Sequence, residues 1–332
     1  MKGMNRGKMI NLVKRNIQKN KKTSSNRGFI KEISKNKAFY LMMLPGLLFI
    51  LVMYYLPMFG VVIAFKDYNP AEGIIKSKWV GLKNFEFFFK SQSASTVTFN
   101  TLFYNIIFIV VGLGLAVLVA VMLNEIRNKF FASLYKSILL FPYLISWVVA
   151  GYLLFSFLSV DRGVINRLLQ YFGLEPIQWY MEPSYWRFII PLSYMWKNVG
   201  YLSVIFFAAI TGISSDYYEA AEMDGASGFK KTIKITIPLI APIIITMFLL
   251  QAGKIFYAGV GDWGMFYNLP RDSGTLYSTT DVIDTYIFRS LKQLNDAGMT
   301  AAIGLYQSIV GFVLVVFTNW LAKKYDPDSA LY

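Results

Sequence analysis

The segment SSDYYEAAEMDGASGFKKTIKITIPLIAP, Ser214 to Pro242, separates two long apolar runs of the chain. It begins with four carboxylates within nine residues, continues with lysines and ends in isoleucine and proline. Each flanking run is long enough to cross a bilayer, because a helix needs about 20 mostly apolar residues to span a hydrocarbon core ~30 Å thick. The sequence therefore predicts a polar connection between two membrane-spanning helices at this point.

The composition of the whole chain agrees with a membrane protein. Of its 332 residues 55% are hydrophobic and 16% are charged, whereas about a quarter of the residues of an average soluble domain are charged. The sequence contains no cysteine and no histidine. This excludes disulfides, zinc or haem sites built on those ligands, and catalytic groups that need them. We expect no metal and no catalytic residue.

Six apolar segments are long enough for a crossing, and they predict an all-α membrane protein with six transmembrane helices. The expected spans are 38–65, 97–123, 137–158, 186–210, 237–260 and 299–321. A basic arm, 1–37, precedes the first span, a loop at 211–236 joins the fourth span to the fifth, and a tail at 322–332 follows the last.

The net charge of +14 is concentrated at the N-terminus, where the arm holds twelve Lys or Arg and the single acid Glu32. A basic arm before a first span favours a cytoplasmic N-terminus. With six spans, the C-terminus and the loop at 211–236 are then cytoplasmic too. The expected cytoplasmic segments hold 20 Lys or Arg, against 11 outside. The arm either only sets this topology and touches anionic membrane lipid, or docks onto a cytoplasmic partner; its position beside a span argues against nucleic-acid binding.

The polar connection has the pattern of a short helix. Asp216 is expected to cap its N-terminus, with Glu219 three residues further on as in a capping box. Glu222 adds a third acid at the same spacing, and like charges so arranged are mildly destabilising. A cationic partner, most naturally arginine, would relieve that repulsion. The small residues Ala220 and Ala221 would let the surface of such a partner approach closely.

A glycine divides the connection into two arms. Gly225 fits a left-handed position that ends the first helix. Ser227 is expected to cap a second short, lysine-rich helix. Pro238 suits the start of the next span, because its missing N–H is not needed there. We therefore expect a helix–glycine–helix elbow, a shape suited to docking another protein.

These residues resemble the EAA motif of permease subunits of binding-protein-dependent ABC importers. Glu219-Ala220-Ala221 is followed after three residues by Gly225, after nine more by Ile235 and then by Pro238, with Ile237 in place of the usual leucine. The resemblance covers most of the chain beyond the arm and implies the type I importer (MetI-like) permease fold. It implies that the elbow is a coupling helix, which inserts into a cleft of a cytoplasmic ATPase, where Glu219 pairs with an arginine. The residues to which it assigns coupling are Glu219, Ala220, Ala221, Glu222, Asp224, Gly225, Ala226 and Pro238.

Three further stretches resemble the LplB-like branch, whose members import oligosaccharides derived from polysaccharides. They are Phe141–Trp147, Trp196-Lys197 and Asp281–Tyr286. The resemblance implies a bacterial cell-membrane complex with a second, homologous but different permease, a cytoplasmic ATPase dimer and an extracellular solute-binding protein, expected to be a lipoprotein. The chain itself has no P-loop, since its two Gly-Lys pairs lack the required spacing. We therefore expect no enzymatic activity and no cofactor on this chain, with ATP and Mg²⁺ on the partner ATPase.

Apart from Arg187 at the edge of the fourth span, Lys197 and Lys254 are the only charges inside the expected spans. An ionised lysine at mid-membrane is costly unless it meets water, a partner or a ligand. Both are expected to line one outward-facing cavity, where they would favour a carboxylated sugar such as a uronate-containing oligosaccharide. The candidate residues of this substrate path are Tyr194, Trp196, Lys197, Asn198, Gln251, Lys254 and Tyr257. Alternatively, Lys254 extends to the membrane surface, Lys197 pairs with an acid of another subunit, and the aromatic rings only pack.

The outside segment 261–298 is long for a loop, and such loops are usually functional or disordered. Its Trp263, Tyr267, Asn268 and Arg271 are expected to contact the binding protein or to reach into the path.

Two functions of other classes fit the sequence less well. An ion-coupled secondary transporter of a small polar solute would need carboxylates inside the spans, and the expected spans contain none. A membrane enzyme such as a glycosyltransferase would need clustered acids facing one site, and no such pair is evident. Transport by a lone subunit without ATP would favour the first of these over an importer.

Overall fold

The computed structural model describes residues 35–325, so most of the predicted basic arm and most of the predicted tail lie outside the described residues. The chain forms two compact units, divided between Val61 and Val62. The described helices long and apolar enough to cross a membrane are Lys37–Phe65, Gln92–Asn124, Gly228–Ala252 and Ala297–Leu321. Two bent helix pairs raise the candidates to 6 when each pair is counted as one span. This agrees with the six-span helical membrane fold expected from the sequence.

The first unit is an apolar helical rod within the described residues. It comprises α3 (Lys37–Ile50), the π-turn η1 (Leu51–Tyr55) and α4 (Leu56–Met58), and the 3-10 helix η2 (Phe59–Phe65) continues the chain into the second unit. No side chain of α3 is buried, and apolar residues such as Leu47 and Phe49 are more than half exposed. A helix that is apolar on all sides needs an apolar environment around it, such as lipid or other helices.

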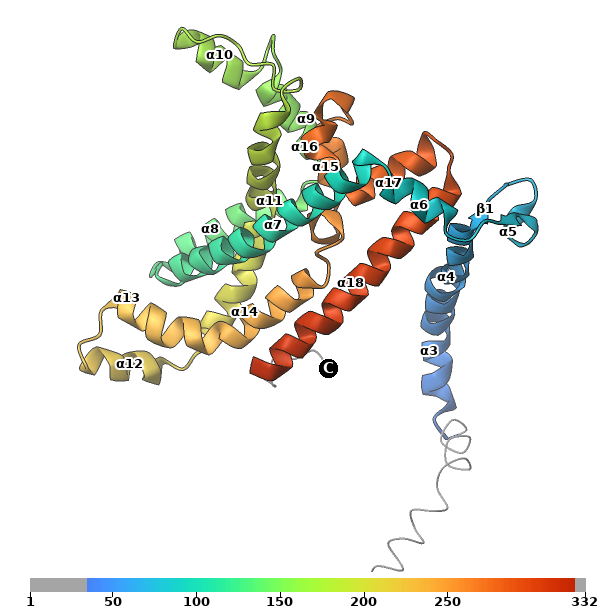
Figure 1. The fold of residues 1–332 in the computed structure, drawn as a ribbon. Coiled ribbons are helices and arrows are strands. Elements are labelled where there is room, and N and C mark those ends of the chain that lie inside the picture. The colour runs from blue at the N-terminus through green and yellow to red at the C-terminus, as the bar shows by residue number, and fades with distance from the viewer. Residues whose placement is uncertain (1–34, 326–332) are drawn as a thin grey trace, which may run out of the picture. The chain divides into compact units, whose positions relative to one another are not determined.

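The second unit is organised around two long helices, α7 (Gln92–Asn124) and α11 (Pro183–Thr211) (Figure 1). In one part of their contact, large aromatic side chains are buried together, with Phe108 stacked on Tyr194 at 3.9 Å between ring centroids. In the other part the contact is made by smaller residues such as Ala120. Small residues let helices approach closely, and they are typical of helix contacts in membranes.

The third span is broken, which differs from the single helix expected over 137–158. Its pieces are α8 (Lys129–Leu140), the 3-10 turn η3 (Phe141–Leu144) and α9 (Trp147–Leu158). The two helical parts are bent by 97°. Pro142 cannot continue the hydrogen bonds of α8, and Ser146 starts the new helix by accepting a hydrogen bond from the amide of Val149 at 3.3 Å.

A hairpin between α9 and α11 carries the short helix α10 (Val164–Tyr171), and it projects beyond both long helices (Figure 1). The one buried residue of α10 is Asn166. Its side-chain amide donates to the carbonyl of Ile177 at 3.0 Å, and its oxygen accepts from Trp179 Nε1 at 3.1 Å. Asn166 therefore holds the hairpin closed.

The polar connection forms α12 (Ser215–Met223), and one continuous helix then runs from Gly228 to Ala252. Its parts are α13 (Gly228–Lys231), the π-turn η4 (Thr232–Thr236) and α14 (Ile237–Ala252). The fifth span therefore begins before the predicted residue 237 and ends before the predicted residue 260. The lysine-rich second arm of the elbow is the first part of this span, not a separate helix.

The segment from 253 to 296, expected as the end of a span and a long outside loop, folds into short helices. These are η5 (Ala258–Gly261), α15 (Gly264–Asn268), η6 (Gly274–Leu276), α16 (Tyr277–Thr280) and α17 (Ile283–Lys292). Met265, Phe266 and Leu276 are buried in the same cluster as Tyr104 and Trp186 of the two long helices. The segment is therefore part of the core.

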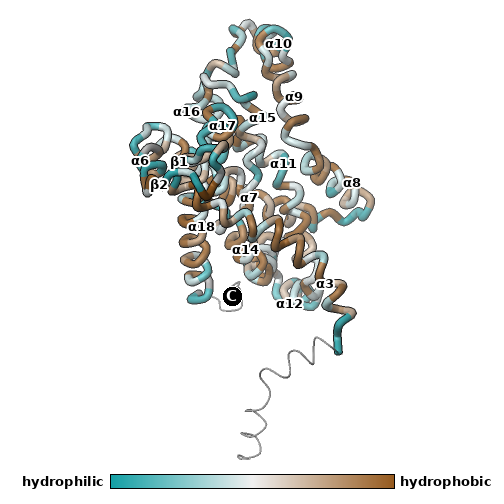
Figure 2. The backbone as a smooth tube through the Cα atoms, turned by 90° about the vertical axis from the view of Figure 1, so that its right-hand side faces the viewer, coloured by the Kyte–Doolittle hydropathy of each residue, from teal (hydrophilic) through white to brown (hydrophobic). Residues whose placement is uncertain are grey.

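The last helix, α18 (Ala297–Tyr325), packs against α6 (Lys83–Phe89) and α14. Near α6 lie α5 (Gly73–Lys76) and a two-stranded antiparallel sheet of β1 (Lys66–Asp67) and β2 (Lys78–Trp79). Figure 2 shows apolar residues along α14 and α18 and polar residues around β2 and α6. This distribution suits a membrane-spanning body with a polar end.

Candidate functional site

A cavity of about 400 Å³ lies beside the end of α14. It brings together four of the residues predicted for the substrate path: Tyr194, Asn198, Gln251 and Lys254. Its other lining residues are Tyr143, Tyr201, Leu202, Leu250, Gly259, Val260, Gly261 and Asp262. Elements far apart in the sequence, η3, α11, α14 and η5, therefore form one polar and aromatic cavity.

The cavity exists because the chain unwinds after Ala252. Gly259, Val260 and Gly261 have positive φ angles of 63°, 54° and 95°. This conformation is easy for glycine but strained for a β-branched residue such as Val260. Such strain occurs mostly at binding sites and switch regions.

Polar side chains from three other helices bind the backbone groups that the unwinding frees. Asn105 of α7 donates to the carbonyls of Ile255 and Tyr257 at 2.7 and 2.9 Å, and it accepts from the amide of Val260 at 3.1 Å. Asp284 of α17 accepts from the amide of Ala258 at 2.7 Å. Non-helical backbone at membrane depth is tolerated where it is buried in protein or lines a cavity, and this segment does both.

Gln307 of α18 completes this support. Its amide nitrogen donates to the carbonyl of Phe256 at 2.7 Å and to the carboxylate of Asp284 at 3.1 Å. Burial raises the pKa of the Asp284 carboxyl above its ordinary value, although its hydrogen bonds with Ala258 and Gln307 act in the opposite direction. The unwound segment is therefore a fixed feature of the fold and not a frayed helix end.

The cavity offers groups that suit a hydroxylated ligand. Gln251 and Asn198 contribute side-chain amides to its lining. The rings of Tyr143 and Tyr201 stack at 4.3 Å between centroids. Lys254 supplies a cation and Asp262 an anion. The arrangement combines aromatic faces, amides and charges, which can bind a ligand's apolar ring face, hydroxyl and carboxylate groups.

Lys197 does not line this cavity, so the expectation that both lysines lie there is wrong for Lys197. It is 6% exposed, and its ammonium group donates to the carbonyl of Tyr143 at 2.8 Å and to that of Ile145. It also lies 5.2 Å from the centre of the Trp147 ring. Lys197 therefore binds the carbonyls left free where the third span breaks. This places it in the protein's own packing.

Two aromatic residues predicted for the path also lie elsewhere. Trp196 is 47% exposed and is not among the residues that line the cavity. The Tyr257 hydroxyl lies 3.5 Å from Ser308 of α18, so its ring packs on that helix. Helical periodicity explains the difference for Trp196, because it points to another face of α11 than Tyr194 and Asn198. Tyr257 is beyond the helix end, where periodicity no longer applies.

Sequence reasoning missed Asp262 and Tyr143 as cavity residues. Asp262 lies just after the expected fifth span, so a search for charges inside spans does not find it. The sequence did offer a signal for the unwound segment, namely the glycines at 253, 259 and 261. Glycines are frequent where a helix unwinds. Tyr143 enters the cavity only because the third span bends.

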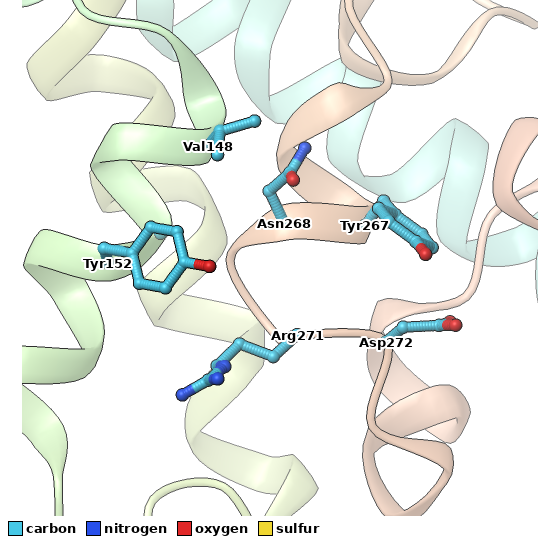
Figure 3. A pocket seen from close by; sticks show the side chains of 7 residues that line it. Val148, Tyr152, Tyr267, Asn268, Arg271 and Asp272 are labelled. Carbon is cyan, nitrogen blue, oxygen red and sulfur yellow. The ribbon is translucent and has the colours of Figure 1, made fainter.

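The predicted loop residues divide between two places. Tyr267, Asn268 and Arg271 line a second pocket of about 180 Å³ between α9 and α15, together with Val148, Gly151, Tyr152 and Asp272 (Figure 3). Trp263 is not part of that pocket. Its ring packs against Phe288 of α17 at 5.3 Å between centroids.

The elbow has the predicted glycine turn but a different cap. Ser214 caps α12 by accepting from the amide of Asp216 at 3.3 Å, so Asp216 is inside the helix and the expected capping box with Glu219 does not form. Gly225 has a φ of +72°. The amide of Ala226 donates to the carbonyl of Ala221 at 2.9 Å, a bond that closes a Schellman turn.

The two motif glutamates differ in their surroundings. Glu222 pairs with Lys231 at 2.6 Å, and this hydrogen bond, with the lysine's charge, holds the Glu222 pKa below its ordinary value. The cation next to Glu222 is thus in the same chain. Glu219 is exposed and forms no ion pair with the rest of residues 35–325. Of the two motif glutamates, Glu219 is the one that is free to meet a partner.

Other coupling residues lie on or near the same surface. Ala220, Asp224 and Gly225 are exposed, while Ala221 and Ala226 are partly buried. Pro238 lies within the continuous helix 228–252, directly after the π-turn, and does not start the span as predicted. A proline has no N–H to offer the preceding turn, which is consistent with a wider turn at that point.

The fold and the site define a class of protein: a multi-pass helical membrane protein with a polar elbow between two spans and a cavity at an unwound helix. Residues 109–327 match the family described as binding-protein-dependent transport system inner membrane component, and the chain belongs to this family. This confirms the family predicted from the EAA motif and favours an importer subunit over an ion-coupled transporter.

The chain is similar over nearly its full length to two curated proteins of Bacillus subtilis (strain 168). It is 34% identical over 309 residues to the polygalacturonan/rhamnogalacturonan transport system permease protein YteP, covering 93% of this chain and 94% of that protein. It is 33% identical over 298 residues to the protein LplB, covering 90% and 92%. The resemblance to the LplB-like branch is thereby confirmed.

A solved structure has a similar fold. A chain of a bacterial ABC transporter involved in the import of the acidic polysaccharide alginate matches with a TM-score of 0.82 and 30% identity, over 90% of this chain and 99% of that one. A second structure, of the bacterial alginate ABC transporter with a periplasmic protein bound to an alginate pentasaccharide, matches with a TM-score of 0.80. The type I importer permease fold is confirmed by these matches.

Proposed function

We propose that this chain forms half of the translocation pore of an ATP-driven importer of acidic oligosaccharides. The observation that carries the proposal is the cavity at the unwound helix, with Lys254, the side-chain amide of Gln251 and stacked tyrosine rings. The names of similar proteins support the substrate class. Polygalacturonan is a polymer of a sugar acid, and alginate is described as an acidic polysaccharide.

The cavity chemistry fits a uronate-containing sugar. The ammonium group of Lys254 would pair with a sugar carboxylate, because hydrogen bonds between ionised groups are about twice as strong as neutral ones. Gln251 and Asn198 would bond hydroxyls, and the rings of Tyr143 and Tyr201 would pack on a sugar face. In this proposal none of these groups makes or breaks a covalent bond, so the subunit is proposed to be non-catalytic and to hold no cofactor.

Energy would come from a separate cytoplasmic ATPase dimer that binds ATP and Mg²⁺. Glu219 is an exposed, unpaired acid of α12, and an arginine of the ATPase is its proposed partner. Movement of the ATPases would pass through α12 and the Gly225 turn into the helix 228–252. That helix ends at the cavity, so one continuous helix connects the Gly225 turn with the cavity. Alternating access would follow.

Orientation and partners complete the proposal. The basic arm favours an N-terminus in the cytoplasm, which places the elbow and the C-terminus there and the segment 261–298 outside. A second, homologous permease would form the other half of the pore as a heterodimer. An extracellular solute-binding protein would deliver the sugar. The unburied side chains of α3 would face lipid or this partner permease.

The test is uptake by the assembled importer in proteoliposomes, with its binding protein and with ATP inside. Lys254→Met should raise the KM for an acidic oligosaccharide by about 10-fold or more, the loss expected for one charge-assisted hydrogen bond. A neutral oligosaccharide should be affected much less. Lys254→Arg should restore part of the preference, and Lys76→Met, a change outside the cavity, should have no effect. Equal loss for acidic and neutral sugars, or no loss for either, would contradict the proposal.

A further inference from the structure

The pocket between α9 and α15 is separate from the cavity. No residue lines both, and the pocket is much the smaller of the two, about 180 Å³ against about 400 Å³. The pocket therefore offers a ligand less room than the cavity does.

A close contact of two backbones fixes the walls of the pocket. A Cβ atom on Gly151 of α9 would lie 2.6 Å from the carbonyl oxygen of Asn268, so only glycine lets α9 and α15 come this near. Beside that contact, Tyr152 extends from α9 and Arg271 from the chain after α15, and the two side chains face the same hollow (Figure 3). The pocket is thus positioned by packed helices, although its residues come from distant parts of the sequence.

Arg271 keeps its charge unpaired although an acid follows it directly. Both Arg271 and Asp272 have positive φ angles, 57° and 50°, which are uncommon for residues other than glycine. Their side chains point in different directions (Figure 3). The Asp272 carboxylate accepts a hydrogen bond from the Tyr277 hydroxyl at 2.8 Å. Across the described residues, 35–325, no carboxylate lies within the 4.0 Å of an ion pair from Arg271.

Aromatic rings hold the Arg271 guanidinium in place. Its central carbon lies 4.2 Å from the centre of the Phe155 ring and 5.9 Å from that of Tyr152. A guanidinium that stacks on a ring through its face keeps the N–H groups of its edge available. That edge matches the two oxygens of a carboxylate, which it can bind through two parallel hydrogen bonds.

We propose that this pocket is a carboxylate-binding subsite, distinct from the cavity, that takes one uronate residue of an acidic oligosaccharide. Arg271 binds the carboxylate, and Asn268 and the tyrosines at 152 and 267 surround the sugar ring. The strained backbone at Arg271 and Asp272 keeps the two opposite charges apart, so the guanidinium stays free for the ligand. This inference rests on the proposed function, because it requires that the importer handles acidic sugars.

A carboxylate on the solute-binding protein has the same chemistry, so the test separates the two sources. The assembled permease–ATPase complex in nanodiscs is titrated with linear trigalacturonate and with its neutral methyl ester, in the absence of the binding protein. Affinity of the complex for the ligand-free binding protein is measured separately. The variants are Arg271→Gln and Arg271→Lys, with Arg167→Gln as the matched control, since Arg167 is an exposed arginine on α10 away from both pockets.

Arg271→Gln should weaken binding of trigalacturonate by about 10- to 100-fold and leave the ester nearly unchanged. Arg271→Lys should retain part of the affinity for trigalacturonate, because lysine keeps the charge but cannot form the bidentate hydrogen bonds. Arg167→Gln should behave as the wild type. Thermal unfolding of each complex shows whether a loss reflects misfolding, and a folded Arg271→Gln complex with unchanged trigalacturonate affinity overturns the subsite.

Two further outcomes distinguish the proposals. If Arg271→Gln weakens only the affinity for the binding protein, the carboxylate belongs to that protein and the sugar subsite is wrong. If the wild type does not distinguish trigalacturonate from its ester, while Lys254→Met leaves uptake of both unchanged, the proposed function itself fails and the subsite fails with it.

Discussion

Trp147 donates its indole N–H to the carboxylate of Asp262 at 2.6 Å, and this bond joins the first residue of α9 to the end of the unwound segment. The centre of the same Trp147 ring lies 5.2 Å from the ammonium group of Lys197. Lys197 in turn binds the carbonyls of Tyr143 and Ile145 at the break of the third span. The broken span and the cavity are therefore connected through one short series of contacts.

The Trp147–Asp262 bond should be measurable as a coupling energy. Trp147→Phe and Asp262→Ala should each destabilise the complex, and the double variant should lose about 1–2 kcal/mol less than the sum, because the bond can be lost only once. Thermal unfolding of the purified complex measures all three variants. Asp262→Asn is the matched control, since it keeps an oxygen acceptor and should cost less than alanine. Strictly additive losses would show that the contact contributes nothing.

Lys197 should act on stability and not on sugar preference. Lys197→Met leaves the carbonyls of Tyr143 and Ile145 without their donor, and an unsatisfied buried acceptor costs about 1–3 kcal/mol. We therefore expect a lower unfolding temperature of the complex, with an unchanged ratio of KM values for acidic and neutral oligosaccharides. Lys254→Met should show the opposite pattern. A stable Lys197→Met complex that has lost its acid preference would return Lys197 to the substrate path.

The comparison of these lysines shows what the sequence could and could not predict. Hydropathy is a property of neighbouring residues, so the six spans and the polar elbow were visible from run lengths and composition. The position of Lys197 was not visible, because its acceptors are carbonyls about 50 residues away and are free only where the third span bends. A proline such as Pro142 is tolerated in many membrane helices, so its presence alone does not predict a bend of 97°.

The unwound segment illustrates the same limit. Asn105 and Gln307 are polar residues inside apolar spans, so each was expected to have a hydrogen-bond partner. Their partners are backbone groups of residues 255–260, which become available only after α14 ends at Ala252. The elbow was easier to predict, because its motif, its glycine and its cap depend only on residues that are close in the sequence. Even there, the cap was assigned to Asp216 and not to Ser214, since both residues are good caps and only the helix start distinguishes them.

The exposed Glu219 and the paired Glu222 should respond differently to substitution. Glu219→Lys should reduce recovery of the ATPase with the purified permease by about 10-fold or more, since it places like charges across the proposed contact. Glu222→Gln removes only an exposed pair with Lys231 of the same chain, and such pairs contribute little. It should change recovery less than about twofold, the same as Lys231→Met. Quantitative co-purification measures each variant, and equal losses from Glu219→Lys and Glu222→Gln would argue against a special role for Glu219.

The turn at Gly225 provides a test of the elbow that does not alter charge. Gly225 has a φ of +72° and open space around its Cα, so alanine there meets no clash but must adopt a left-handed backbone. This conformation costs about 1–2 kcal/mol for a residue with a Cβ atom. Gly225→Ala should therefore shift or loosen α12 and lower ATP-driven uptake, whereas Gly225→Asn should be tolerated better, because asparagine adopts this conformation more readily.

Gly228→Ala is the matched control for Gly225→Ala. Gly228 also has open space around it, but it begins the helix 228–252 with an ordinary φ, so alanine should be neutral or slightly stabilising. Uptake per assembled complex and the unfolding temperature are measured for the two variants side by side. If Gly225→Ala and Gly228→Ala cannot be distinguished in either measurement, the left-handed turn is not what holds α12 in its orientation.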